Sequence, residues 1–341
     1  MPRMSRLLVV IVNTATPDMV IDCLQSLAPE LRQLLKTEVV VVNNPMGDDS
    51  DERITALIEE EAYDWCRVVS SDKNGGFAYG NNIAIRAALA STDRPEYIML
   101  LNPDTIVRPR ALTKLVEFMD EHPRVGICGS QLEGPNGELD LSGHRMPTPL
   151  SETIAATGLG VLYRLFAGRM DDLPIVDENF ECDWVSGAAL FARAEVYEQI
   201  GLIDEALFVY FEEPDFCSRA QAAGWQVWIV SRSRILHLEG QTTGVTDASK
   251  PRAAYWYNSR RYFFVKHYGV IGLVAADIGW LLGRITLLIR RVFRLGGSTE
   301  SNPKHFMRDL ILGDLKALAN GSAFQRNKPN PSLEEARRLG F

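Results

Sequence analysis

Carboxylates stand at two places in this chain where they could do chemistry. The first is Asp104, which follows the five apolar residues Tyr97–Leu101. That run predicts a strand buried on both faces, and Pro103 ends it because proline cannot donate to a sheet ladder. A carboxylate just past the carboxyl end of a strand lies where open α/β sheets bind ligands. It suits a hard cation, which also takes water and phosphate oxygens. The alternative is an Asp in a turn that starts the next helix.

The second place is Glu212-Glu213-Pro214-Asp215. Pro214 fits the first turn of a helix, so Glu212 and Glu213 are expected just before the helix and Asp215 in its first turn. The preceding residues 208–211 are strongly apolar, and a carboxylate emerging from such surroundings can have a raised pKa and act as a general base.

A structural interpretation of the same acids stays open. Three acids at a helix N-terminus complement the helix dipole, and Arg219 can pair with one of them. This interpretation suits Glu212 and Asp215 better than Glu213. His237 follows a predicted strand, and a lone histidine is more often structural; it gains weight only together with Asp104.

Alternating strands and helices position these residues. Apolar runs predict strands at 7–12, 39–42, 68–69, 97–101 and 125–128, and helical spacing separates them. This pattern predicts a doubly wound, mostly parallel sheet with right-handed crossovers. The loops that carry Asn13, Asn43, Asn74 and Asp104 then meet at one edge of the sheet.

The loop at 74–82 is rich in glycine and asparagine and lies between a strand and a helix. Its glycines would let the backbone approach a ligand, and a helix N-terminus favours anions. A tight strand–helix turn is the alternative. Further along, 135–137 predicts a hairpin tip, 146–180 a variable loop region, 214–223 a helix, and 188–192 and 226–230 strands.

Composition excludes several classes of protein. The 341 residues are 46% hydrophobic and 23% charged, which is ordinary for a soluble globular protein. A net charge of −8 argues against nucleic-acid binding through bulk electrostatics. Five scattered cysteines without metal-type spacing indicate a reducing, cytoplasmic compartment. The first apolar run is too short for a signal sequence.

In this order, the motifs resemble the family 2 glycosyltransferases with the GT-A fold, most closely the bacterial rhamnosyltransferase-like members. Each motif is weak alone, but the ordered set is specific and covers residues 7 to about 245. The matching stretches are Asn13, Asn43-Asn44, Asn74 to Asn82, Leu100 to Thr105, Trp184 to Ala188, Gly201 to Arg219, and His237 with Gly240.

The resemblance implies an inverting, metal-dependent transfer of a sugar, L-rhamnose among the candidates, in cell-surface glycan synthesis. The donor would be a nucleotide-diphosphate sugar, and the acceptor a hydroxyl of a polysaccharide or lipid-linked glycan. Asp104 and His237 would bind Mg²⁺ or Mn²⁺, and Glu213 would be the catalytic base. The implied substrate-binding residues are Asn13, Asn43, Asn74, Gly75, Gly76, Phe77, Asn81, Asn102, Trp184, Gly187, Glu212, Asp215 and Arg219.

Two residues depart from the pattern of the family. Asn43 stands where many relatives have Asp, which makes the preference for a nucleotide base less certain. Glu213 also stands where Asp is usual, so this base reaches one methylene further.

Other functions fit the sequence less well. A sugar nucleotidyltransferase needs a Gly-rich, basic loop after the first strand, and a nicotinamide dehydrogenase needs G-x-G-x-x-G there; residues 13–17 have neither. A non-catalytic sugar-nucleotide-binding or scaffold subunit is the third alternative, and the presence of Asp104, Glu213 and His237 argues against it.

We expect residues 1–245 to form the transferase domain and 246–341 a helical, partly amphipathic extension. The apolar run 269–283 is interrupted by Asp277 and is shorter than the ~20 residues that span a bilayer. Four arginines then interleave with aliphatic residues, which suits a helix at the cytoplasmic face of an anionic membrane. A helical hairpin packed on the catalytic domain, or on a second copy in a homodimer, is the alternative. The arginines are Arg284, Arg290, Arg291 and Arg294.

Overall fold

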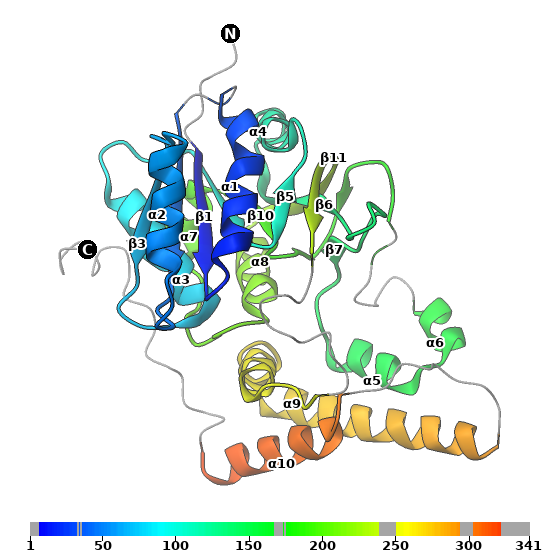
Figure 1. Cartoon of the computed structure of the whole chain (residues 1–341). Helices are drawn as coiled ribbons and strands as arrows, with labels where there is room; N and C mark the ends of the chain where they lie inside the picture. The colour runs from blue at the N-terminus through cyan, green and yellow to red at the C-terminus, as the bar shows by residue number, and fades with distance from the viewer. Residues whose placement is uncertain are drawn as a thin grey trace.

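The computed structural model describes residues 7–32, 34, 36–166, 173, 175–238, 250–293 and 303–321. At its centre lies a nine-stranded sheet with the order β3-β2-β1-β4-β10-β6-β11-β5, and β8 pairs with β11 (Figure 1). A two-stranded sheet joins β7 and β9. The strands are β1 (Leu7–Asn13), β2 (Thr37–Asn43), β3 (Cys66–Ser70), β4 (Tyr97–Leu101), β5 (Thr105–Val107), β6 (Val125–Glu133), β7 (Gly143–His144), β8 (Phe180–Glu181), β9 (Trp184–Val185), β10 (Ala189–Arg193) and β11 (Gln226–His237).

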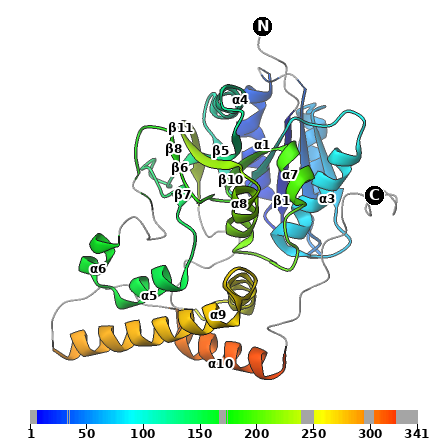
Figure 2. The same ribbon diagram turned by 180° about the vertical axis from the view of Figure 1, so that it is seen from behind.

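Helices cover both faces of the central sheet, and a further group lies beneath it (Figure 2). The helices are α1 (Pro17–Leu31), α2 (Ser50–Glu60), α3 (Gly76–Ala90), α4 (Ala111–Glu121), α5 (Pro149–Thr157), α6 (Gly160–Leu165), α7 (Ala194–Ile200), α8 (Glu212–Ala222), α9 (Ala254–Val292) and α10 (Phe306–Ala319).

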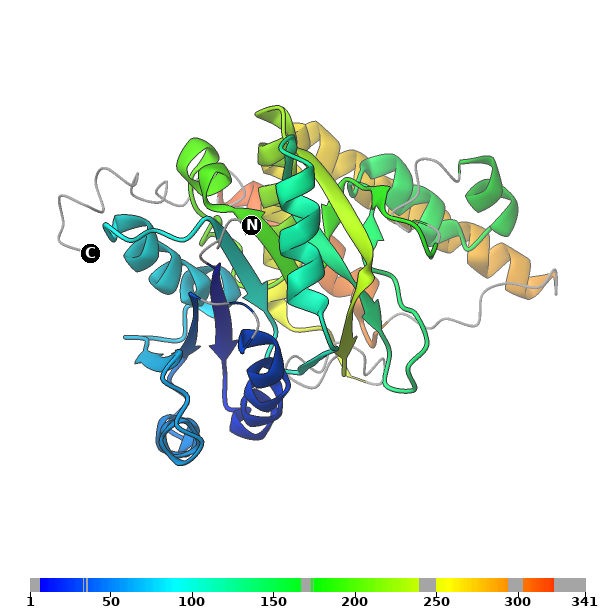
Figure 3. The same ribbon diagram turned by 90° about the horizontal axis from the view of Figure 1, so that it is seen from above.

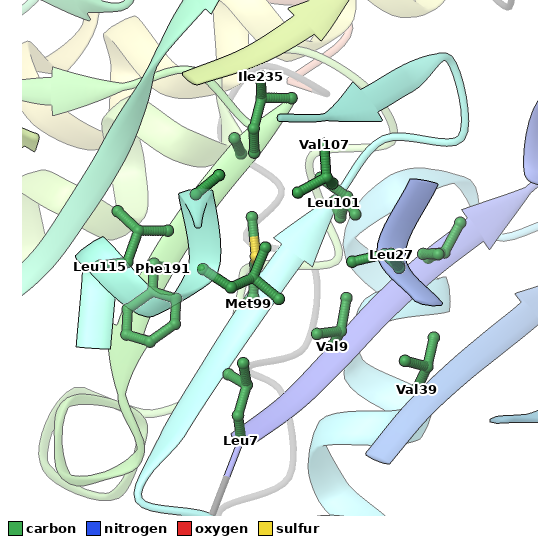
Figure 4. Close-up of a cluster of buried hydrophobic side chains, with 14 of the residues drawn as sticks. Leu7, Val9, Leu27, Val39, Met99, Leu101, Val107, Leu115, Phe191 and Ile235 are labelled. Carbon is green, nitrogen blue, oxygen red and sulfur yellow. The ribbon is translucent and has the colours of Figure 1, made fainter. Parts of the chain in front are cut away.

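The strand β1 is buried on both sides, as its unbroken apolar run predicts. Leu7 and Val9 face the cluster that packs under α1 and α4, together with Met99 and Phe191 (Figure 4). Leu8 faces the opposite cluster, to which α3, α7 and α8 contribute. Covering both faces removes any polar alternation from the strand.

The predicted doubly wound α/β architecture is confirmed. The strands β3, β2, β1 and β4 run parallel, so their polar ends share one edge of the sheet. The later strands complete a mixed sheet: β10 is antiparallel between β4 and β6, and β5 is antiparallel to β11. These antiparallel pairings return the second half of the chain to the edge where β4 ends.

Two predictions about the second half are wrong. Residues 146–180 contain the helices α5 and α6 rather than only a variable loop. Their periodicity is weak because α5 packs through small side chains, with Thr153 and Ala156 against glycines of α9. The helix α8 also begins at Glu212 and not at Pro214, because left-handed residues precede it.

Below the sheet, α5, α9 and α10 form a helical layer (Figures 1 and 2). The helix α9 bends at Gly269, whose φ is 67°. Seen from above, the second half of α9 extends beyond the sheet together with α6 (Figure 3). The predicted domain boundary at 245/246 lies outside the described residues.

Candidate functional site

The pairing of β5 with β11 brings Asp104 and His237 together. His237 lies opposite Thr105 in the ladder, and its Nε2 is 3.3 Å from Asp104 Oδ1. The side-chain amide of Asn102 is 3.4 Å from the same imidazole nitrogen. Three residues predicted from two separate motifs therefore share one corner of the sheet edge.

This corner fits a divalent cation. Asp104 is only 4% exposed, and apart from the contact with His237 its buried Oδ1 has no hydrogen-bond partner among the described residues. Buried polar atoms usually have partners, so an orphaned carboxylate oxygen beside an imidazole suits a metal ligand. No group of three or more His, Cys, Asp or Glu gathers for a metal in the described ranges. A cation held by Asp104 and His237 would take its remaining ligands from water and phosphate.

A neighbouring loop holds the carboxylate of Glu213. The backbone amide of Gly187 donates to Glu213 Oε1 over 3.0 Å, and a Cβ at position 187 would collide with that oxygen. The next residue, Ala188, accepts a hydrogen bond of 3.1 Å from the amide of Asn102. One short loop thus connects the end of β4, where the predicted metal residues begin, to the predicted base.

Both glutamates at the start of α8 have raised pKa values. Burial raises the pKa of Glu213, against the opposing effects of its backbone hydrogen bonds, including that from Gly187, and of nearby His144. Burial and the adjacent charge of Glu213 raise the pKa of Glu212 well above its usual value. A carboxylate with a raised pKa binds a proton more strongly, as a general base near neutral pH requires.

The backbone before α8 is strained. Tyr210 and Phe211 both adopt left-handed conformations, with φ of 73° and 70°. Such residues cost about 1–3 kcal/mol each and cluster at functional sites. They turn the chain so that the helix starts at Glu212, which places both glutamates in its first turn.

Asp215 and Arg219 have protein partners. The Oδ1 of Asp215 lies 2.6 Å from Lys266 Nζ and 2.9 Å from His267 Nε2 of α9, and its Oδ2 accepts from Arg219. Burial opposes ionisation, but His267, Arg219 and Lys266 hold the pKa of Asp215 well below its usual range. Arg219 also donates to the carbonyl oxygens of Ile200, the last residue of α7, and of Leu202 just after it. These contacts fasten α8 to α9, while the predicted substrate contacts of both residues stay predictions.

Asparagines fix the ends of the parallel strands. Asn13 donates to the Oδ1 of Asn43 over 2.6 Å, and its own oxygen accepts from Thr16. In α3, Asn81 donates to the carbonyl of Phe77, while its buried Oδ1 meets no donor among the described residues. The side chains of Asn13 and Asn43 therefore join the ends of β1 and β2. Asn81 has an acceptor oxygen without a partner among the described residues.

The glycine-rich loop packs closely on another part of the protein. Asn74 Oδ1 accepts from the amide of Gly76, and Phe77 donates to the carbonyl of Phe208 over 2.8 Å. A Cβ on Gly76, whose φ is 83°, would collide with that carbonyl, and one on Gly75 would meet a tyrosine ring. The glycines are thus required for packing, whether or not the loop also contacts a ligand.

His144 is a site residue that the sequence analysis missed. Its ring stacks on Trp184, with centroids 4.1 Å apart and an interplanar angle of 17°. The indole of Trp184 donates to the carbonyl of Arg145. His144 belongs to the two-residue strand β7, which is too short to give a sequence pattern. Only the pairing of β7 with β9 brings it to Trp184 and within electrostatic range of Glu213.

Comparisons with known proteins define the class. The model of "Glycosyl transferase family 2" matches residues 7–171, and that of "Glycosyl transferase family group 2" matches residues 97–295. This chain belongs to the family 2 glycosyltransferases, as the ordered motifs indicated.

Individual relatives include rhamnosyltransferases. The N-acetylglucosaminyl-diphospho-decaprenol L-rhamnosyltransferase of Mycobacterium tuberculosis is 28% identical over 158 residues, which are 45% of this chain and 50% of that protein. The dTDP-rhamnosyl transferase RfbF of Shigella flexneri is 23% identical over 305 residues, 85% of this chain and 92% of the relative. The chain spans about half the length of the first curated relatives it matches.

Solved structures share the fold. The mannosyltransferase PcManGT of Pyrobaculum calidifontis, in complex with GDP-Man and Mn²⁺, aligns with a TM-score of 0.54 at 14% identity, covering 99% of this chain and 84% of that one. TarS of S. aureus aligns with a TM-score of 0.52 at 17% identity, covering 98% and 53%. The architecture is therefore of the predicted GT-A type.

Proposed function

We propose that this protein is an inverting, metal-dependent glycosyltransferase that moves a sugar from a nucleotide-diphosphate donor to an acceptor hydroxyl. The observation that carries the proposal is the shared edge of the sheet: Asp104 and His237 form one corner, and Glu213 is held beside it by Gly187. Family membership supports the same reaction.

In the proposed reaction, Glu213 accepts the proton of the acceptor hydroxyl. The hydroxyl oxygen forms a bond to the anomeric carbon while the bond from that carbon to the diphosphate oxygen breaks. The nucleoside diphosphate leaves with the electron pair of the broken bond, and a single displacement inverts the configuration. The raised pKa of Glu213 supports this role, because the proton must pass to the carboxylate as the new bond forms.

Asp104 and His237 would hold Mg²⁺ or Mn²⁺. When bound, the cation would neutralise charge on the departing diphosphate. Gly187 orients the base through its hydrogen bond, and His144 supplies a polar group near it. The stacked ring of Trp184 offers an apolar face on which a sugar ring can lie.

The donor we propose is deoxythymidine-diphosphate-L-rhamnose, because two of the matching relatives carry rhamnosyl transfer in their names. The acceptor would be a lipid-linked or polysaccharide glycan, handled at the cytoplasmic side of the membrane. Nucleic acid is not an expected partner.

A thermal-shift panel tests the donor and the metal together. Thymidine and uridine diphosphates, with their sugars, are added with Mg²⁺ or Mn²⁺. A ligand at 100 times its dissociation constant adds about 2.7 kcal/mol to the free energy of unfolding. Stabilisation by uridine sugars and none by thymidine sugars would overturn the proposed donor.

The variant Asp104→Asn is expected to fold but lose metal-dependent binding of the donor. The matched control is Asp64→Asn, an exposed residue in the turn before β3. Unchanged turnover in Asp104→Asn, with metal still required, would remove Asp104 from the site. If the wild-type protein binds the donor but releases no nucleoside diphosphate, the result would favour a non-catalytic sugar-nucleotide-binding subunit instead.

A further inference from the structure

The second half of α9 turns hydrocarbon outward along its whole length. Among the side chains that the structure describes from Ile271 to Val292, the exposed ones follow one another at helical spacing of three and four, and all of these are apolar. Ile271 is 86% exposed and Val292 is 77% exposed. We call this stripe the α9 apolar face; it comprises Ile271, Val274, Ala275, Ile278, Leu281, Leu282, Ile285, Leu288, Ile289 and Val292.

The opposite side of the same helix is already occupied. Gly279 and Gly283 allow α5 to pack closely, since a Cβ on either would collide with Thr153 or Ala156. Asp277 points to the same interior and is ion-paired with Arg260 at 2.9 Å. Asp277 therefore faces inward while the hydrocarbon faces outward, which reverses the usual pattern of a surface helix.

Neighbouring helices of the layer add to the exposed hydrocarbon. Leu312 and Leu315 of α10 are each 58% exposed, and Val161 and Leu165 of α6 are also largely exposed. Contiguous apolar patches of this extent mark interaction sites, because soluble monomers rarely keep them in water.

Charge indicates what covers this surface. Residues 250–321 carry twelve Lys and Arg against four Asp and Glu, although the whole chain carries 36 against 44. Arg308 and Lys316 are exposed on α10 on either side of its two exposed leucines. A helical layer with a basic excess and an apolar outer face, in a net-acidic protein, complements an anionic bilayer.

We propose that the α9 apolar face lies in the interface of an anionic lipid bilayer, with the sheet facing away from it. By length and composition, Ala254–Arg290 could cross a membrane. However, 39% of its most apolar window is buried inside the protein, and the Asp277–Arg260 pair and α5 occupy one flank. Because the charged cluster of Arg260 stays inside this helical layer, we place the helix along the membrane surface and not across it. This inference does not depend on the proposed reaction.

Flotation of the full chain with vesicles tests the inference. We expect binding to vesicles rich in phosphatidylglycerol, weaker binding in high salt, and little binding to phosphatidylcholine alone. Replacing Ile278→Gln, Leu282→Gln and Ile289→Gln together should abolish binding, and Arg284→Gln with Arg290→Gln and Lys316→Gln should weaken it at low salt. The matched control is Ile175→Gln with Val176→Gln, which replaces exposed apolar residues before β8.

A site-specific probe reports the orientation. All five native cysteines are buried, so Leu282→Cys can be labelled selectively with an environment-sensitive dye. Its emission should shift to the blue with anionic vesicles, whereas the same dye on Ile175→Cys should not respond. Wild-type protein that ignores anionic vesicles at low salt would overturn the proposal, as would a glutamine stripe that still binds. A dimer that dissociates in the stripe variant, without vesicle binding, would assign the face to a second copy.

Donor hydrolysis in solution separates this inference from the proposed function. The stripe variant should still release nucleoside diphosphate at the wild-type rate, because its substitutions lie outside the candidate site. Loss of vesicle binding with hydrolysis retained supports the inference. Loss of both, with a lower unfolding temperature, would show that the stripe is part of the packed core and overturn it.

Discussion

The helices α8 and α9 depart in opposite ways from the usual pattern of a soluble helix, which buries apolar residues and exposes charged ones. The first turn of α8 buries carboxylates: Glu212 is almost wholly covered, and Asp215 is completely so. The second half of α9 exposes hydrocarbon along its length. An ordinary soluble helix does the reverse of both, because burying charge and exposing apolar surface each cost free energy.

The difference between the helices lies in how each departure is compensated. Inside α8, Asp215 is neutralised by cations of α9 and its own helix, whereas the glutamates are left with raised pKa values. On α9, nothing among the described residues covers the apolar face. A buried charge that is paired within the protein therefore indicates a structural role. A buried acid without such a partner, or an uncovered apolar face, indicates a place where a substrate or another surface binds.

The largest effect on activity should follow from replacing Glu213 of α8. Glu213→Gln keeps the shape of the side chain but cannot accept a proton, so turnover should fall by roughly 10²–10⁴-fold while donor binding persists. Steady-state rates and thermal shifts with donor measure the two quantities separately. The neighbouring Glu212→Gln is the matched control: it should retain far more activity, because Glu213 keeps its charge and its hydrogen bond from Gly187.

Normal turnover in Glu213→Gln would transfer the role of base to Glu212 or Asp215. It would also remove the functional contrast between Asp215, which is paired with cations, and Glu213, which is not, in the same helix turn.

The compensated acid should matter for stability. Asp215→Asn leaves Lys266, His267 and Arg219 around an uncharged group, and breaking such a buried pair costs about 3 kcal/mol. Chemical unfolding at neutral pH measures this loss. The stabilisation is fully present above the unfolded-state pKa of about 3.9 and disappears as the pH falls through the lower folded-state value. The less buried Asp204→Asn, which also loses Lys266, should cost less.

The sequence specifies the parallel half of the fold well. Continuous apolar runs such as 97–101 identify strands buried on both faces, and alternation with helices then places Asp104 at the edge. Antiparallel pairings at long range are not visible in local patterns. That is why residue patterns alone left His237 as a lone histidine, and only the family resemblance paired it with Asp104; the ladder of β5 with β11 brings the two residues together.

Local patterns also fail where small or strained residues decide the structure. The helix α5 packs through Thr153 and Ala156, which give little hydrophobic periodicity. The start of α8 depends on Tyr210 and Phe211 in left-handed conformations that their residue types disfavour. Composition revealed that α9 is apolar and basic, but only the packing of its neighbours shows which face is exposed.

A buried cluster of charged residues, shared by α5, α9 and α10, allows a further test of the comparison between α8 and α9. The guanidinium of Arg260 forms ion pairs with the carboxylates of Glu152, Asp277 and Asp314, and Arg261 pairs with the other oxygen of Asp314. Three carboxylates thus meet two guanidinium groups. Burial, despite Arg260 and with the help of the nearby Asp314, raises the pKa of Asp277 to about 7.

The effect that is smallest for each pH unit is a pH dependence from Asp277. Between its unfolded pKa of about 3.9 and its folded value of about 7, the folded state holds one proton more than the unfolded state. The free energy of unfolding should therefore fall as the pH rises through this window, by about 1 kcal/mol per pH unit, and level off above it. Asp277→Asn should flatten this slope in chemical unfolding between about pH 5 and about pH 8. Asp309→Asn on α10, a partly exposed acid, should leave it unchanged. An unaltered slope in Asp277→Asn would mean that Asp277 stays ionised across this range, as Asp215 of α8 does.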